Sequence, residues 1–238
     1  MTKICILLLL SILVAVTNVS ANNNNNNNKN LATDPWMNAQ SSPEQRARIL
    51  MSHMTSEEKR SMLYGTGDAD KHAKYVGNVP AIPRLNIPAL KYNDGPQGFR
   101  DNAMLGSTTA WPSGLTVAAS WDTETMRTWG EAMGKEFFDK GANVQLGPGV
   151  CVARIPRNGR NFEYLSGEDP HLGYILVQPV INAIQGQQVV ANAKHYVNNN
   201  QETNRHFVSE NVDERTRFEM YYPPFKGAIE AGVGSMMC

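Results

Sequence analysis

The sequence predicts an α/β protein, specifically an incomplete (β/α)8 TIM-type barrel with about five of the eight βα units of a closed barrel. Helical patterns alternate with short apolar runs, which is typical of βαβ units around a parallel sheet. Three apolar runs end in charged or glycine-rich segments, and barrel enzymes place binding groups at the carboxyl ends of several strands. A doubly wound dinucleotide fold is disfavoured because no G-x-G-x-x-G motif occurs. The chain has 238 residues, whereas a closed barrel typically needs about 250.

The N-terminal segment has the pattern of a secretory signal peptide. Lys3 precedes an apolar run, and small residues around Ala21 offer a cleavage site. A homopolymer of asparagine follows, which cannot bury apolar area and indicates a disordered spacer. We therefore expect a signal peptide over residues 1–21, an Asn-rich spacer over 22–34 and one partial barrel domain over 35–238. The protein is expected to be secreted, either outside the cell or to a lysosome through the secretory pathway.

The composition describes a neutral globular chain. Lys plus Arg and Asp plus Glu both number 22, and hydrophobic residues make up 41%. A balance of charge gives no electrostatic footprint for nucleic acid, and we expect no membrane partner once the signal is removed. Cys151 and Cys238 are expected to be unpaired thiols.

Helix boundaries follow from capping signals. Ser42 with Pro43, and the capping box that begins at Thr55, each open a helix. Asp122 caps a longer helix that Gly141 ends. Further helices are expected from Pro170 and from Asp213, the second of them broken at a pair of prolines. Strands are expected at residues 87–92, at 143–146, within 188–196 and from 233, and residues 65–88 are expected to form a loop.

Two polar clusters follow the first two predicted strands. The segment DGPQGFR (residues 94–100) places Asp94 at the end of a strand, where its carboxylate suits paired hydroxyl groups. The alternative is an ordinary Asp-Gly-Pro turn. The segment RIPRNGRNFE (residues 154–163) contains Arg160 among three arginines. It is either an anion-binding loop or a loop whose arginines pair with nearby carboxylates such as Glu163.

A third cluster emerges directly from an apolar run. Lys194 and His195 follow buried-type residues, and a charge placed there costs free energy unless its hydrogen bonds are accepted. A ligand rich in hydroxyl oxygens would accept them, and so would a buried carboxylate such as Glu202. Glu202 and Arg205 belong to a fourth cluster over residues 198–206, which we expect to support the Lys-His pair.

Taken together, the clusters resemble glycoside hydrolase family 3, the β-glucosidase-type enzymes, over residues 35–238. DGPQGFR, then GRNFE with LSGEDP, then KHY with QETNR occur in the order of the family's three sugar-binding loops. The resemblance implies an N-terminal barrel domain whose Asp94, Arg160, Lys194 and His195 hold the hydroxyls of a terminal β-linked sugar, with no cofactor and no metal.

The resemblance also predicts what this chain lacks. A retaining glycosidase needs two carboxyl groups, one as nucleophile and one as acid/base. The family takes its nucleophile from a later barrel strand and its acid/base from a further domain. We therefore expect no catalytic residue here, and an inactive C-terminally truncated fragment that a complementing C-terminal fragment would complete. A non-catalytic carbohydrate-binding module and a non-functional relic remain as alternatives.

Overall fold

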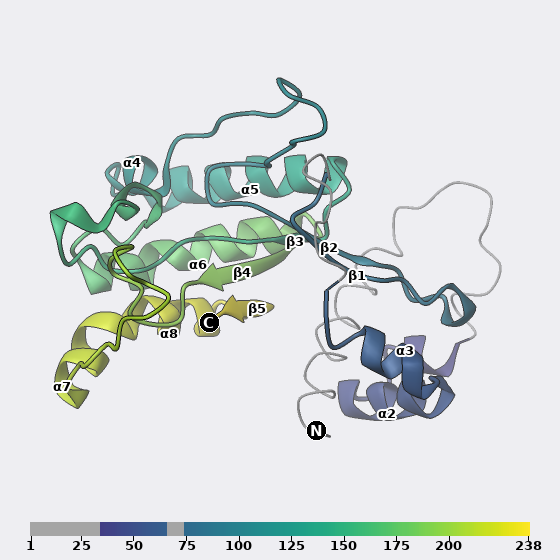
Figure 1. Cartoon of the computed structure of the whole chain (residues 1–238). Helices are drawn as coiled ribbons and strands as arrows, with labels where there is room; N and C mark the ends of the chain where they lie inside the picture. The colour runs from purple at the N-terminus through teal and green to yellow at the C-terminus, as the bar shows by residue number, and fades with distance from the viewer. Residues whose placement is uncertain (1–33, 66–73) are drawn as a thin grey trace. The chain divides into compact units, whose positions relative to one another are not determined.

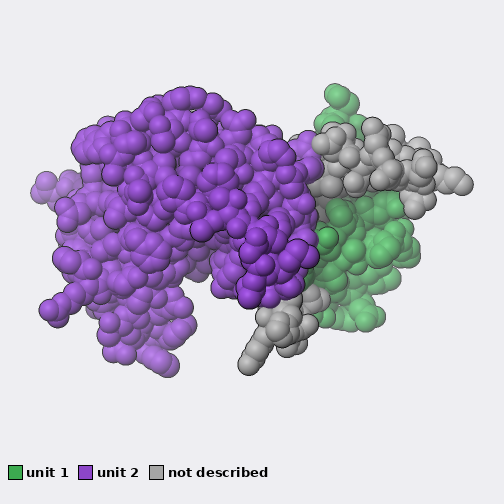
Figure 2. All heavy atoms as spheres, turned by 90° about the horizontal axis from the view of Figure 1, so that it is seen from above, with its two compact units in different colours: residues 1–71, 76–91 green, residues 72–75, 92–238 purple. Residues whose placement is uncertain are grey.

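The computed structural model describes residues 34–65 and 74–238, which form two compact units (Figure 2). The first unit comprises residues 34–65 and 76–91 of the described chain, and the second comprises 74–75 and 92–238. The predicted signal peptide and nearly all of the predicted spacer lie outside the described residues. Within the described part, no helix has the length and apolar character needed to cross a membrane.

The first unit contains two short helices that begin at the predicted caps. Helix α2 (Pro43–His53) follows Ser42, whose hydroxyl accepts a hydrogen bond from Gln45 N at 3.2 Å. Helix α3 (Ser56–Ser61) follows Thr55, which forms a reciprocal capping box with Glu58. The expectation of a continuous loop over residues 65–88 is wrong, because this segment contains strand β1 (Gly77–Val79) and a 3-10 turn (Pro83–Leu85). A strand of three residues is too short to show the alternation that predicts strands.

The second unit is built on a parallel sheet. Strands β2 (Leu90–Asn93), which begins in the first unit, β3 (Val144–Gln145), β4 (Val190–Lys194) and β5 (Ser235–Met237) pair side by side in chain order. The register pairs Tyr92 with Val144, Val144 with Val190, and Ala193 with Met236. All four strands lie in or overlap the predicted segments, so the expected incomplete α/β barrel is confirmed.

Three helices cover this sheet (Figure 1). Helix α6 (Pro170–Gly186) packs against α5 (Thr123–Asp139) on one side and against α8 (Pro223–Glu230) on the other. A shorter helix, α4 (Gly114–Ala118), was not predicted. One face of α5 is buried in the core together with the apolar face of α6: Met126, Trp129, Met133 and Phe137 from α5, and Leu176, Val180 and Ile184 from α6.

Glycines allow close approach between these helices. A Cβ at Gly134 of α5 would meet Ile184 Cα at 3.0 Å, and one at Gly227 of α8 would meet the carbonyl oxygen of Tyr174 at 2.3 Å. The predicted break near the prolines is present. Helix α7 (Glu214–Thr216) passes into a π-helical turn (Arg217–Tyr221), and Pro223 and Pro224 then open α8. Proline is tolerated in the first turn of a helix, where its missing N–H has no intrahelical partner.

Candidate functional site

The carboxyl ends of β2 and β4 bring two of the predicted site residues to one edge of the sheet. Asp94 follows the last residue of β2, and Lys194 is the last residue of β4. The loop after β3 pairs with the end of β4 through a bridge between Gly149 and Lys194. Asp94, Arg160 and Lys194 all line a cleft of about 510 Å³, hereafter the polar cleft, whose remaining wall is formed mainly by residues 95–110. His195 does not line the cleft but contacts Arg160 from beside it.

The loop that carries Asp94 is held by a buried asparagine. Asn93 donates from Nδ2 to the carbonyl oxygens of Lys74 at 3.1 Å and Arg100 at 2.9 Å, and its Oδ1 accepts from Asp94 N at 2.9 Å. Gly98 has a φ of +126°, and a Cβ there would meet the carbonyl oxygen of Thr109 at 2.6 Å. Only glycine fits this turn, so the backbone fixes the position of the Asp94 carboxylate.

Lys194 is paired with Asp94. Its ammonium lies 3.9 Å from Asp94 Oδ1, and the side chain is only 4% exposed. Burial lowers the pKa of Lys194, while the carboxylates of Glu163 and Asp94 act in the opposite direction. Asp94 also lies 3.3 Å from Arg100. Glu202, the example given above of a carboxylate that could accept from Lys194, pairs instead with Arg160 and Arg205, and the carboxylate that Lys194 meets is that of Asp94.

Arg160 is held by carboxylates on two sides. It forms an ion pair with Glu163 and lies 3.3 Å from Glu202 Oε1, and the other oxygen of Glu202 lies 2.7 Å from Arg205. Glu202 and Arg205 therefore support the guanidinium of Arg160, whereas the sequence assigned them to the Lys-His pair. The alternative of ion pairing within the loop is confirmed for Glu163, which is buried.

His195 lies between Arg160 and Tyr164. Its Nδ1 is 3.2 Å from the hydroxyl of Tyr164, and its Nε2 is 3.4 Å from Arg160 Nη2. Burial lowers the pKa of His195 from 6.5 to about 3, and the cations of Lys194, Arg160 and Arg205 contribute in the same direction. The imidazole is therefore neutral at physiological pH. The importance of Tyr164, which is fully buried, was not predicted, since a tyrosine beside a leucine reads as an ordinary core residue.

Cys151 lies under this cluster. The backbone N–H of His195 donates to Cys151 Sγ at 3.3 Å, and burial raises the pKa of this thiol to about 11. Among the described residues, Cys151 and Cys238 are free cysteines. A protonated, buried thiol suits a structural role and not a nucleophilic one.

The arrangement of charges in the polar cleft suits a neutral, hydroxylated ligand. The carboxylate of Asp94 accepts hydrogen bonds, while the ammonium and guanidinium of Lys194 and Arg160 donate them. Each carboxylate that lines the cleft is already engaged by a cation: Asp94 by Lys194 and Arg100, Glu163 by Arg160, and Asp101 by Lys140. Among the described residues, no group of three or more His, Cys, Asp or Glu side chains is arranged to hold a metal ion.

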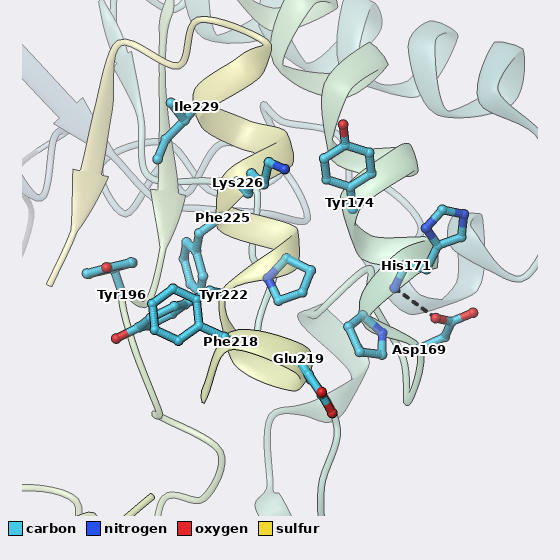
Figure 3. Close-up of a pocket in the computed structure, with 12 residues that line it drawn as sticks. Asp169, His171, Tyr174, Tyr196, Phe218, Glu219, Tyr222, Phe225, Lys226 and Ile229 are labelled. Atoms are coloured by element: carbon cyan, nitrogen blue, oxygen red, sulfur yellow. Dashed lines mark hydrogen bonds between the residues drawn. The ribbon is translucent and has the colours of Figure 1, made fainter. Parts of the chain in front are cut away.

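A second cavity lies between α6, α8 and the chain after β4 (Figure 3). It has a volume of about 670 Å³, and we refer to it as the aromatic pocket. Its rings pack on one another: Tyr196 stacks on Tyr222 with ring centroids 6.0 Å apart, and it lies edge-on to Phe225 with centroids 5.1 Å apart. None of the predicted site residues lines it, and its aromatic residues come from segments whose proximity no sequence motif indicates.

Comparisons with known proteins identify the family. The family model described as the glycosyl hydrolase family 3 N-terminal domain matches residues 62–238. Beta-glucosidase 1 of Aspergillus aculeatus is 42% identical over 221 residues, which cover 86% of this chain and 25% of that protein. Probable beta-glucosidase A of Emericella nidulans is 40% identical over the same shares of the two chains. The chain thus spans about a quarter of the length of the curated relatives that it matches.

Solved structures of beta-glucosidases also resemble this chain. DesR, a beta-glucosidase from Streptomyces venezuelae in complex with D-glucose, superposes with a TM-score of 0.75 and 37% identity, over 81% of this chain and 24% of that one. The beta-D-glucoside glucohydrolase of Trichoderma reesei gives a TM-score of 0.73 and 35% identity, over 87% and 28% of the two chains. On these grounds, the chain belongs to glycoside hydrolase family 3, and residues 62–238 correspond to part of that family's N-terminal barrel domain.

Proposed function

We propose that this chain carries the sugar-holding part of a β-glucosidase-type site, for a retaining, exo-acting O-glycosyl hydrolase that acts on terminal β-D-glucosyl residues. The observation that supports this most is the pair between the buried Lys194 and Asp94, which joins the ends of two strands and lines the polar cleft beside Arg160. The names of the relatives, beta-glucosidases from fungi and bacteria, agree with a β-glucoside as the ligand.

Each side chain has a distinct part in this proposal. Asp94 accepts hydrogen bonds from neighbouring hydroxyls, and Lys194 and Arg160 donate to hydroxyl oxygens. His195 adds a polar contact at the end nearest Arg160. Glu202 and Arg205 hold the guanidinium of Arg160 in place, so that little side-chain entropy is lost when the sugar binds.

Hydrolysis needs groups that the polar cleft does not provide in the required state. A retaining mechanism uses two carboxyl groups about 5–5.5 Å apart, one as nucleophile and one as acid/base. The three carboxylates of the cleft are all engaged by Lys or Arg. We therefore propose that the nucleophile and the acid/base come from outside these 238 residues, and that the chain by itself binds sugar without cleaving a glycoside. A polypeptide that supplies the remaining barrel strands would be its partner.

Secretion is part of the same proposal. It rests on the charged and apolar pattern of residues 1–21, together with the small residues before Asn22. N-terminal sequencing of the exported product checks it. A mature chain that begins at Asn22 supports the proposal, and retention of Met1 in a cytosolic product contradicts it.

Calorimetry with glucose, run beside an assay on an aryl β-glucoside, tests the function. We expect saturable glucose binding and no turnover by the 238-residue chain. Turnover that Asp94→Asn abolishes would contradict the assignment of catalysis to other residues. Absence of glucose binding would contradict the whole proposal and favour a non-functional relic. Turnover restored by a C-terminal polypeptide of a relative separates an enzyme fragment from a carbohydrate-binding module that has no catalytic partner.

A further inference from the structure

The wall of the polar cleft has a charged part and an uncharged part. The chain at the ends of β2 and β4 contributes the charges of Asp94 and Lys194. The segment NAMLGSTTA (residues 102–110) contains no charged residue. Six of its members line the cleft: Asn102, Leu105, Gly106, Thr108, Thr109 and Ala110. A ligand that fills the cleft therefore meets charges on one part of the wall and uncharged side chains on another.

The loop that carries this segment, residues 101–107, is fixed at both of its ends. It belongs to the connection between β2 and α4, which rises above α5 in the view of Figure 1. The buried carboxylate of Asp101 accepts hydrogen bonds from the backbone N–H groups of Ala103 at 3.1 Å and of the next residue at 2.9 Å. Its other oxygen lies 3.7 Å from Lys140 Nζ, which donates to the hydroxyl of Ser107 at 2.8 Å. One carboxylate and one lysine thus hold the two ends of the loop together.

A second anchor lies just beyond the loop. Glu136 of α5 accepts a hydrogen bond from Thr109 N at 2.8 Å and another from Trp111 Nε1 at 2.7 Å. The chain on both sides of the loop tip is therefore held by α5 and by Lys140, the residue that follows this helix. A loop that is held in this way loses little conformational entropy when a ligand binds to it.

Leu105 is the apolar side chain that this loop presents to the cleft. It is 87% exposed and lines the cleft, whereas Met104 beside it is 64% exposed and does not line the cleft. Covering an exposed leucine with another apolar group is favourable because it removes apolar surface from water. Since the loop is anchored, Leu105 can gain this free energy only from a ligand or from another chain.

The cleft is larger than a single glucosyl unit requires. Its volume of about 510 Å³ is typical of pockets that hold drug-sized ligands, about 300–1,000 Å³. In the proposed function, the hydroxyls of the glucosyl unit bind to Asp94, Arg160 and Lys194. The wall around Leu105 is then left for the group linked to the anomeric oxygen, the aglycone. Because this wall and the sugar-holding residues line one cleft, the aglycone is favoured over another chain as the group that covers Leu105.

We propose that the loop over residues 101–107 gives this site a preference for β-glucosides with an apolar aglycone, an alkyl or aryl group that packs on Leu105. The inference rests on the proposed function, which supplies the glucosyl unit. A second sugar is a less favourable aglycone, because hydroxyl groups placed against a leucine lose hydrogen bonds to water.

Calorimetry with a series of alkyl β-D-glucosides tests the inference on the 238-residue chain. We expect affinity to rise from methyl through butyl to hexyl β-glucoside, by about tenfold over the series, since each added methylene removes apolar area from water. Cellobiose places a second glucosyl unit in the position of the aglycone and should bind more weakly than hexyl β-glucoside. Tighter binding of cellobiose than of hexyl β-glucoside overturns the inference.

Leu105→Ser and Met104→Ser form a matched pair of variants. Both remove a largely exposed apolar side chain from the same loop, so neither takes packing from the core. In Leu105→Ser, we expect the ratio of hexyl to methyl β-glucoside affinity to fall to about twofold or less. In Met104→Ser, the ratio should stay near tenfold, as in the wild type. A ratio that Leu105→Ser leaves unchanged overturns the inference, and so does an equal fall in both variants.

The same titrations distinguish failure of the inference from failure of the proposed function. A wild type that binds methyl β-glucoside but gains nothing from a longer alkyl group contradicts the inference alone and leaves Leu105 to a contact with another chain. A wild type that binds neither glucose nor methyl β-glucoside contradicts the proposed function, and the inference with it.

Discussion

The polar cleft and the aromatic pocket lie in the same unit but satisfy their lining side chains in different ways. In the cleft, charged groups pair with one another: Lys194 pairs with Asp94 across the ends of two strands, and Arg160 pairs with Glu163 within one loop. In the aromatic pocket, the aromatic rings pack against one another, as Tyr196 does by stacking on Tyr222. Paired charges leave lone pairs and protons free for a hydroxylated ligand, whereas packed rings leave few polar atoms unused. The comparison favours the cleft as the place for the sugar binding that we propose.

Of the changes considered, removing the charge of Asp94 should have the largest effect on glucose affinity and on the free energy of unfolding. Asp94→Asn leaves the buried ammonium of Lys194 without its partner and removes the acceptor for sugar hydroxyls. We expect glucose affinity to fall roughly 10- to 100-fold and the free energy of unfolding to fall by about 1–3 kcal/mol. Calorimetry and urea denaturation measure the two effects.

The matched control for Asp94→Asn is Asp139→Asn, which breaks an exposed pair with Lys135 on α5. Exposed pairs contribute about 0–1 kcal/mol, so both readouts should stay close to the wild type. Equal losses of glucose affinity and stability in the two variants would contradict a specific role for the Asp94 carboxylate.

A change at Gly227 should disturb the wall of the aromatic pocket without touching the cleft. An added Cβ would lie 2.3 Å from the carbonyl oxygen of Tyr174, so α8 must shift away from α6. We expect Gly227→Ala to lower the free energy of unfolding by about 1–3 kcal/mol. The folded protein should keep its glucose affinity.

Gly186→Ala is the control for the glycine change, because a Cβ there meets nothing within 4 Å. Its stability should equal or exceed that of the wild type, since alanine favours a helix over glycine by about 1 kcal/mol. Loss of glucose affinity in Gly227→Ala at temperatures where it is folded would contradict the separation of the two cavities.

Acid should lower the stability of the folded protein through His195. The unfolded chain binds a proton at His195 below pH 6.5, whereas the folded chain does so only below about pH 3. Between these values the unfolded state holds more protons, so stability rises with pH and is lost as the pH falls through this window. Because the ring is partly open to solvent, we expect His195 to account for a loss of only about 1–2 kcal/mol between pH 6.5 and pH 3.

The difference between the wild type and His195→Gln, measured by urea denaturation across this range, isolates that loss. His171→Gln removes an exposed histidine and should reproduce the wild-type dependence. An acid slope in His195→Gln as steep as that of the wild type would contradict the burial of a neutral imidazole.

The smallest effect is expected in the aromatic pocket itself. Phe218 is 63% exposed and packs edge-on to Tyr222 at 5.1 Å. We expect Phe218→Ser to change the free energy of unfolding by less than about 1 kcal/mol and glucose affinity by less than about twofold. A larger loss of affinity would move sugar binding toward this pocket.

Sequence periodicity predicted the parts of the fold that are long or strongly patterned. Helix α5 shows its buried face in the spacing of Met126, Trp129, Met133 and Phe137, and β4 is long enough to read as an apolar run. Strand β1 and helix α4 span only three and five residues, too few for a period to appear. The π-helical turn before Pro223 was expected only as a break.

The site likewise has a part that the sequence predicted and a part that it did not. Asp94, Arg160, Lys194 and His195 stand in motifs with a chemical reason for their spacing, and the structure brings all four together. The pairing partners were harder to predict, because they depend on which loops meet. Glu202 lies beside Arg160 and not beside Lys194, and Tyr164 reaches His195 from a loop about 30 residues earlier in the chain. No local pattern encodes such contacts.

A crystal structure of this chain soaked with glucose tests the central claim most directly. The account predicts the sugar in the polar cleft, with its hydroxyls within hydrogen-bonding distance of Asp94, Lys194, Arg160 and His195. Glucose seated between α6 and α8 in the aromatic pocket, with the polar cleft holding only water, would contradict it.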